Sequence, residues 1–114
     1  MPGEGMKPLF IPLKRQYFEA FADRSKTEEL RRYGPRWNHH TCQVGRPVVL
    51  SLGYGKTHRI NGTISYFQKQ HGTGFGNGFS RDILAVFGTL DLDIARISII
   101  LEKPRSLLRA KNST

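Results

Sequence analysis

The sequence predicts a small α+β domain: a closed or nearly closed β-barrel of five or six short strands with two or three short helices. Three observations lead to this fold class. The chain has 114 residues, which suits a single domain. Short apolar runs rich in β-branched residues alternate with turns that contain glycine or proline. Two further segments carry apolar residues at helical spacing, and closure of the sheet would remove its exposed edges.

We expect one domain over residues 8–102, with a flexible tail before it (1–7) and a basic tail after it (103–114). The first tail has no apolar signal region, and no run approaches the roughly 20 apolar residues of a membrane helix. The single cysteine, Cys42, excludes a disulfide framework and a zinc site of several cysteines within one chain. We therefore expect a cytoplasmic protein without a membrane partner, metal or other cofactor. The sequence leaves the oligomeric state open.

The first half of the domain predicts two strands and a helix. Prolines flank the apolar run 8–12, which favours an edge strand or an extended entry. Apolar residues at intervals of four then predict a helix over about residues 13–23. Residues 28–33 are expected to begin as a strand, followed by a turn and a polar loop over 36–43. Lys26 then lies at the corner where the helix meets the strand.

The second half predicts three more strands. Residues 47–52 are β-branched at their centre and predict a buried strand. Residues 59–67 predict the next strand, with a bulge at Gly62. The glycine-rich segment 68–79 is expected to be a long loop, and the sequence does not decide whether it acts as a lid. The last strand is expected over 94–101, with one face fully apolar.

A short helix is expected between that loop and the last strand. Ser80 can cap its start and Gly88 can end it, so we place the helix over residues 81–87. The glycine-rich segment before it lacks the Gly-Lys-Ser/Thr sequence that a P-loop requires. We therefore favour a flexible connection over a phosphate-binding loop.

The charge is strongly positive and unevenly arranged along the chain. Lys and Arg number 18 against nine Asp and Glu, which gives a net charge of +9. From Leu30 to Arg81 there is no carboxylate, yet this stretch holds eight Lys or Arg and seven of the twelve aromatic residues. Single-stranded nucleic acid binds such surfaces, because the charges meet phosphates and the rings stack on bases. RNA or another single-stranded nucleic acid is the expected partner; the alternative is an ordinary basic surface over a core of rings.

One segment at the start of the second predicted strand carries the strongest chemical signal. Since residues two apart share a face of a strand, Thr27, Glu29 and Arg31 point the same way. The long side chain of Lys26 can fold over this face. A Lys, a carboxylate and an Arg around one concavity can hold an anion or a polarised carbonyl group. An ordinary solvated strand with two ion pairs explains the same pattern equally well.

Residues 26–31, Lys-Thr-Glu-Glu-Leu-Arg, resemble the signature of the ASCH domain, Lys-Thr-x-Glu-x-Arg after a helix and a small-residue turn. The preceding helix, the Val-Gly-Arg-Pro-Val entry at 44–48 and the last strand follow in the order of that family, so the resemblance covers roughly residues 8–102. It implies a PUA-like β-barrel whose cleft, between barrel and helices, takes RNA or a modified nucleobase. By position, the residues placed around that cleft are Lys26, Thr27, Glu29 and Arg31.

The same resemblance implies metal-independent hydrolase activities as alternatives to binding. Some members deacetylate acetylated cytidine with the Lys of the signature, the residue three positions later and a distant carboxylate. Lys26 and Glu29 occupy the first two positions, although those enzymes have a hydroxyl at the second and residues 68–81 hold no acid. Other members are ribonucleases for single-stranded RNA, with Lys and Tyr chemistry that Lys26 would supply together with Tyr33 or Tyr54.

As a binding module, the domain would admit one unstacked base to the cleft. The ring of Trp37, Tyr33 or Tyr54 would stack on this base, while Glu29 accepts a hydrogen bond from the exocyclic amine of the base. The nucleic-acid-binding residues that we expect outside the signature are Tyr33, Arg36, Trp37, Tyr54 and Lys56. A third interpretation is a protein-interaction domain whose positive charge meets an acidic partner.

Overall fold

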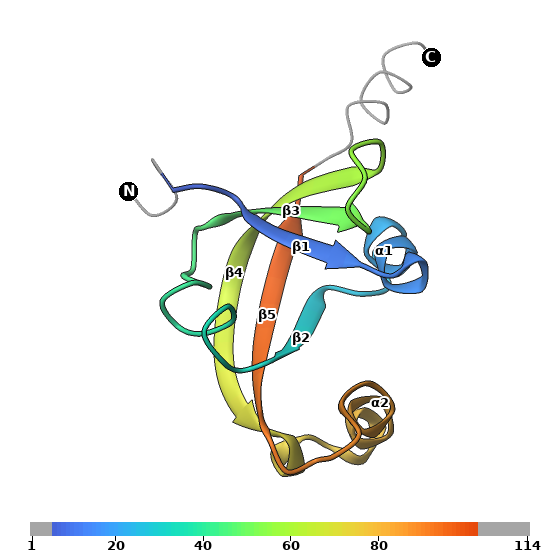
Figure 1. Ribbon diagram of the computed structural model, residues 1–114, viewed down its shortest axis with the longest axis vertical. Coiled ribbons are helices and arrows are strands. Elements are labelled where there is room, and N and C mark those ends of the chain that lie inside the picture. Colours follow the sequence, from blue (N-terminus) through green and yellow to red (C-terminus); the bar gives the residue numbers. More distant parts are fainter. Residues whose placement is uncertain (1–5, 103–114) are drawn as a thin grey trace.

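The protein is described by a computed structural model, which covers residues 6–102. A five-stranded mixed sheet curls into a half-barrel and is accompanied by two α-helices and a 3-10 helix (Figure 1). The strands are β1 (Leu9–Leu13), β2 (Glu28–Arg32), β3 (Pro47–Leu52), β4 (Arg59–His71) and β5 (Asp93–Leu101). The helices are α1 (Arg15–Ala22), the 3-10 helix η1 (Gly72–Gly74) and α2 (Asn77–Phe87). The α+β class is confirmed, with a half-open sheet; apart from residues 6 and 7, the two expected tails lie outside the described residues.

The strand order is β1-β3-β4-β5-β2, so β1 and β2 are the two edges of the sheet. β1 runs parallel to β3, and every other neighbouring pair is antiparallel. β4 joins the two halves, because residues 59–63 pair with β3 and residues 62–71 pair with β5. The prediction of an edge strand near the N-terminus is therefore confirmed.

Buried apolar side chains form two clusters, one on each face of β5. The larger cluster takes Ala95, Ile97 and Ile99 from β5 and also includes Phe18 and Phe21 of α1. The smaller cluster lies at α2 and consists of Phe75, Ile83, Leu92 and Ile94. This alternation along β5 is the one that the sequence predicts. Cys42 is fully buried in the larger cluster, and burial raises the pKa of its thiol.

The structure contradicts the prediction of a long loop over residues 68–79. β4 continues to His71, η1 follows at once, and α2 begins at Asn77. A bulge between Ile64 and Tyr66 shifts the register of β4 against β5 and interrupts the alternation of buried and exposed residues. The alternation of apolar and polar residues that predicts a strand is therefore interrupted halfway along β4. The glycines that follow favour a loop in the sequence-based prediction, so the start of α2 was not predicted.

Gly62 serves close packing and is not the site of the bulge. A Cβ atom at this position would lie 2.8 Å from the Ile100 carbonyl oxygen and 2.9 Å from Ile99 Cγ2. Real Cβ atoms do not approach neighbours so closely, so the contact of β4 with β5 here requires glycine. The predicted bulge thus exists in the same strand, but its position was wrong.

The helix predicted over 81–87 is α2, and it begins earlier than expected. Gly76 is its N-cap, and Ser80 lies inside the helix, where its hydroxyl donates to the Gly76 carbonyl at 3.4 Å. Its end is as predicted, because Gly88 adopts a left-handed φ of 77° and its N–H donates to the Leu84 carbonyl at 2.9 Å.

Candidate functional site

An open cleft of about 1080 Å³ runs along β2, between α1 and α2. Figure 1 shows these two helices apart, with β2 between them. One wall comes from the end of β1 and the start of α1, and its lining residues are Pro12, Leu13, Lys14, Gln16 and Tyr17. The floor consists of Ser25, Lys26, Thr27, Glu28, Glu29, Leu30 and Arg31. The opposite wall belongs to α2 and consists of Phe79, Asp82, Ile83, Ala85, Val86 and Phe87.

A tight turn after α1 fixes the position of Lys26. Arg24 adopts a left-handed φ of 73°, and the Lys26 N–H donates to the Ala20 carbonyl at 3.0 Å. The Ser25 N–H donates to Asp23 Oδ1 at 2.8 Å. Hydrogen bonds from the side chain and backbone of Ser25 hold the pKa of the Asp23 carboxyl below its ordinary value. The predicted corner between helix and strand is thus a hydrogen-bonded turn.

Three charged groups converge on the floor of the cleft. Lys26 Nζ lies 3.4 Å from Glu29 Oε1, and Arg31 Nε lies 2.7 Å from Glu29 Oε2. Glu29 is only 7% exposed, so its carboxylate depends on these two partners. The ammonium group also lies over the rings of Tyr17 and Phe21, 5.5 and 5.3 Å from their centroids. The cleft therefore contains a buried acceptor between two cationic donors.

Arg31 also connects the two edge strands of the sheet. Its Nη2 donates to the carbonyl of Pro12 in β1 at 2.7 Å, while its Nε binds Glu29 in β2. The guanidinium lies 4.7 Å from the centroid of the Trp37 ring, on the side of the larger cluster. Since β1 and β2 are not paired, this side chain bridges the opening of the half-barrel.

α2 is held to the sheet by the smaller cluster and by Arg96. The Arg96 guanidinium donates to both carboxylate oxygens of Glu28, at 3.0 and 3.3 Å, and to Gln70 Oε1 at 2.8 Å. The same group lies 4.9 and 5.7 Å from the ring centroids of Phe75 and Phe79. Arg96 thus links the strand under the cleft with the segment that leads into α2.

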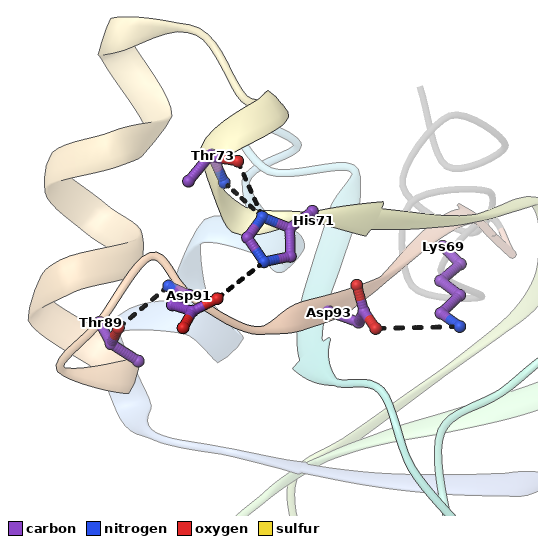
Figure 2. Close-up of polar contacts among 6 residues, drawn as sticks. All are labelled: Lys69, His71, Thr73, Thr89, Asp91 and Asp93. Carbon is purple, nitrogen blue, oxygen red and sulfur yellow. Dashed lines mark hydrogen bonds and ion pairs between the residues drawn. The ribbon is translucent and has the colours of Figure 1, made fainter.

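The segment between β4 and β5, which carries α2, is held at its two ends by contacts of a histidine at the end of β4 (Figure 2). His71 Nε2 lies 3.2 Å from Asp91 Oδ1, and its Nδ1 lies 2.8 Å from the Thr73 hydroxyl. The Asp91 N–H donates to the Thr89 hydroxyl at 2.9 Å, and Lys69 of β4 pairs with Asp93 of β5 at 3.8 Å. These contacts join the two ends of the segment that carries α2, and they set the position of the second wall.

The charges that line the cleft balance. Three cationic residues are opposed by three acidic ones, and together they are Lys14, Lys26, Arg31, Glu28, Glu29 and Asp82. The whole chain carries a formal charge of +9, so this excess belongs to residues outside the lining. The cleft is therefore suited to a neutral polar group, whereas the positive excess attracts anions to residues outside the lining.

The four residues of the signature-like segment lie together. Lys26, Thr27, Glu29 and Arg31 all line the cleft. The expected alternation of faces is present, since Glu29 is paired with Ile97 in the register and Leu30 with Arg96, on opposite sides of the sheet. Leu30 packs against the smaller cluster and is only partly buried, whereas the neighbouring Glu29 is buried.

The other five predicted residues lie outside the cleft lining. Trp37 is 8% exposed, belongs to the larger cluster and lies under the guanidinium groups of Arg31 and Arg36. Its ring is therefore not placed to stack on a base in the cleft. Tyr33 packs against the same cluster, and its hydroxyl lies 3.1 Å from His39 Nδ1.

Tyr54 and Lys56 lie in the turn between β3 and β4. Tyr54 is 78% exposed, and its ring contacts that of Phe10 with centroids 5.9 Å apart. The guanidinium of Arg59 covers the same Phe10 ring at 5.3 Å. This turn carries basic and aromatic side chains, but neither Tyr54 nor Lys56 lines the cleft.

The sequence did not indicate four residues that shape the cleft: Tyr17, Phe79, Asp82 and Val86. Tyr17 was assigned to the apolar stripe of its helix, and it does pack against the larger cluster as well. Phe79 was expected to be in the loop over 68–79, whereas Asp82 and Val86 lie in the predicted helix but not on its predicted apolar face. The exposure of Phe79 and Val86 on a helix is the signal that identifies them once the helix is known.

Within residues 6–102, no group of three or more His, Cys, Asp or Glu side chains is arranged to hold a metal ion. No helix in the described part of the chain has the length and apolar character needed to cross a membrane. The sequence has no significant match among protein-family models or among curated proteins.

Proposed function

We propose that the cleft along β2 binds one nucleobase of single-stranded RNA, while the basic surface outside it holds the neighbouring phosphates. The observation that carries this proposal is the buried Glu29 carboxylate, held between Lys26 and Arg31 at the cleft floor. An ammonium group has three N–H donors, and that of Lys26 forms an ion pair with Glu29 at 3.4 Å. An acceptor beside spare donors matches the polar edge of a base.

The charge distribution supports a base in the cleft and phosphates outside it. The lining is balanced, so a phosphate would meet as many carboxylates as cations there. A base is neutral and presents both faces for stacking, and Tyr17 and Phe79 stand on opposite walls. The formal charge of +9 attracts the phosphates of the whole RNA strand, so the affinity for RNA should fall as the salt concentration rises.

The resemblance of residues 26–31 to the ASCH signature supports the same function. If the half-barrel is PUA-like, the signature lines a cleft beside the helices, and this cleft takes RNA or a modified nucleobase. The four signature residues of this chain do line one cleft, which agrees with that interpretation.

A hydrolase is the second candidate, and one contact favours it. Glu29 Oε1 lies 3.4 Å from Lys26 Nζ, which places a proton acceptor beside the Lys that either hydrolase mechanism uses. Asp82 supplies a further carboxylate on the opposite wall, one residue beyond the acid-free segment. Lys26 would then assist the attack of water on acetylated cytidine, or take the proton of a ribose hydroxyl in RNA cleavage.

Binding and catalysis are separated by one set of variants. Purified protein is titrated with fluorescein-labelled single-stranded RNA and incubated with the same RNA and with acetylated cytidine. We expect Lys26→Ala to weaken RNA binding about tenfold or more, because it removes the ammonium donors that would face the base at the floor of the cleft. Arg15→Ala is the control, since it removes an equal charge from an exposed pair with Glu19 and should cost less than about twofold.

The outcomes select one function. Binding without product supports the module, and turnover that Lys26→Ala abolishes supports the hydrolase. Equal affinities of wild type, Lys26→Ala and Arg15→Ala, in the absence of turnover, would contradict both functions for this cleft.

A further inference from the structure

β2 is an edge strand, and the hydrogen bonds at its ends define which residues face the open side. The Thr27 carbonyl accepts from the Ile99 N–H at 2.9 Å, and the Tyr33 N–H donates to the Asp93 carbonyl at 3.0 Å. Both are directly opposed pairs of the antiparallel register, in which hydrogen-bonded and non-bonded pairs alternate. The backbone groups of Glu28, Leu30 and Arg32 therefore point away from β5.

The cleft lies on this open side of β2. Consecutive residues from Ser25 to Arg31 line it, although successive side chains point to opposite faces of the sheet. Such a continuous lining arises when a cleft runs along the edge of a strand. Within residues 6–102, no other strand pairs with this edge, so the N–H and C=O of Leu30 face the cleft.

We propose that the backbone of Leu30 reads the edge of the bound base, an inference that rests on the proposed RNA-binding function. The Leu30 N–H donates to a ring nitrogen of the base, and the Leu30 carbonyl accepts from the adjacent exocyclic amine. Cytosine and adenine present this acceptor and donor side by side on their Watson–Crick edges, whereas uracil has no exocyclic amine. The cleft is thereby a site for an amino-bearing base.

The surroundings of the edge favour a single flat group as its occupant. A base hydrogen-bonded to Leu30 lies in the plane of the strand, between the wall of Tyr17 and the wall of Phe79 and Val86. Those walls stand on both sides of the edge and hinder the approach of the sheet of a folded partner. The balanced charge of the lining likewise suits a neutral base.

Amide NMR of the wild-type protein tests the proposal without a substitution in the strand. The ¹⁵N-labelled protein is titrated with cytidine, adenosine, uridine and N4,N4-dimethylcytidine. With cytidine or adenosine, we expect the Leu30 amide proton to shift downfield and its hydrogen exchange to slow. Arg32 is the internal control, because its N–H also points away from β5 but its residue does not line the cleft. Loss of both amine N–H donors in the dimethyl analogue should weaken binding roughly fivefold or more.

The outcomes distinguish this inference from the function on which it rests. Binding that shifts Lys26 and Glu29 but leaves the Leu30 amide unchanged would overturn backbone recognition alone. Equal affinity for cytidine and its dimethyl analogue would also overturn it. If neither these nucleosides nor labelled single-stranded RNA binds, the proposed function fails as well. Protection of Leu30 by an acetylated Val-Thr-Val-Thr-Val peptide, and not by nucleosides, would assign the edge to peptide strands and contradict both proposals.

Discussion

Replacement of Arg31 by alanine tests the link between the charged cluster and the stability of the half-barrel. The change removes two hydrogen bonds of 2.7 Å, one to Glu29 and one to the Pro12 carbonyl, and the guanidinium over Trp37. Hydrogen bonds to charged groups contribute about 1.5–3 kcal/mol each, and loss of one partner of a buried ion pair costs about 3–5 kcal/mol. Since the Arg31 side chain is 23% exposed, we take the lower end and expect a loss of about 3 kcal/mol in the free energy of unfolding.

Urea unfolding measures this loss, and the single tryptophan provides the signal. Trp37 lies directly under the Arg31 guanidinium, so its fluorescence reports on the same region, with far-UV circular dichroism as the second probe. The matched control is Arg15→Ala, which breaks an exposed pair at 3.6 Å and should cost less than about 0.5 kcal/mol. If Arg31→Ala cost less than about 1 kcal/mol, or no more than the control, Arg31 would not bridge the two edge strands in solution.

Three further results are expected. Gly72→Ala should destabilise the fold by about 1–3 kcal/mol, because the new Cβ would clash with the Leu90 carbonyl oxygen, whereas Gly55→Ala meets nothing within 4 Å and should be nearly neutral. Urea unfolding compares the two variants, and equal costs would contradict the close packing of Gly72 against Leu90. Cys42 should react slowly with iodoacetamide in the folded protein and readily in urea, because burial raises the pKa of its thiol; rapid labelling of the native state would disprove its burial. The folded-state pKa of Asp23 lies below its ordinary value, so its contribution to stability is present above the unfolded-state pKa and is lost as the pH falls through the folded-state pKa; Asp23→Asn should reduce this acid dependence, and unchanged pH profiles of unfolding would exclude the role of the turn.

The sequence predicts elements well where one periodicity persists. The buried strand at 47–52 and the last strand at 94–101 have unbroken apolar patterns, and both are present in the structure. The charged cluster was also predictable, because period-2 geometry places Glu29 and Arg31 on one face and Lys26 at the preceding corner. Local geometry alone determines these contacts.

Features that depend on distant contacts were not predictable. The bulge after Ile64 shifts the register of β4 against β5, and no residue type at that position predicts it. Trp37 is polar-flanked in the sequence, yet a guanidinium from β2 covers its ring within the core. The α2 wall of the cleft depends on the smaller cluster, which joins residues from β5 and the segment before α2 that the sequence does not connect.

Binding of a single-stranded RNA base in the cleft along β2 can be observed by an NMR footprint. The ¹⁵N-labelled protein is titrated with a short single-stranded oligocytidylate RNA at moderate salt, and the amide shifts are mapped on the fold. We expect the largest shifts at residues 25–31 and 79–87, which form the floor and the second wall of the cleft. Shifts confined to the exposed turn of Tyr54 and Lys56, or no shifts at all, would contradict binding in this cleft.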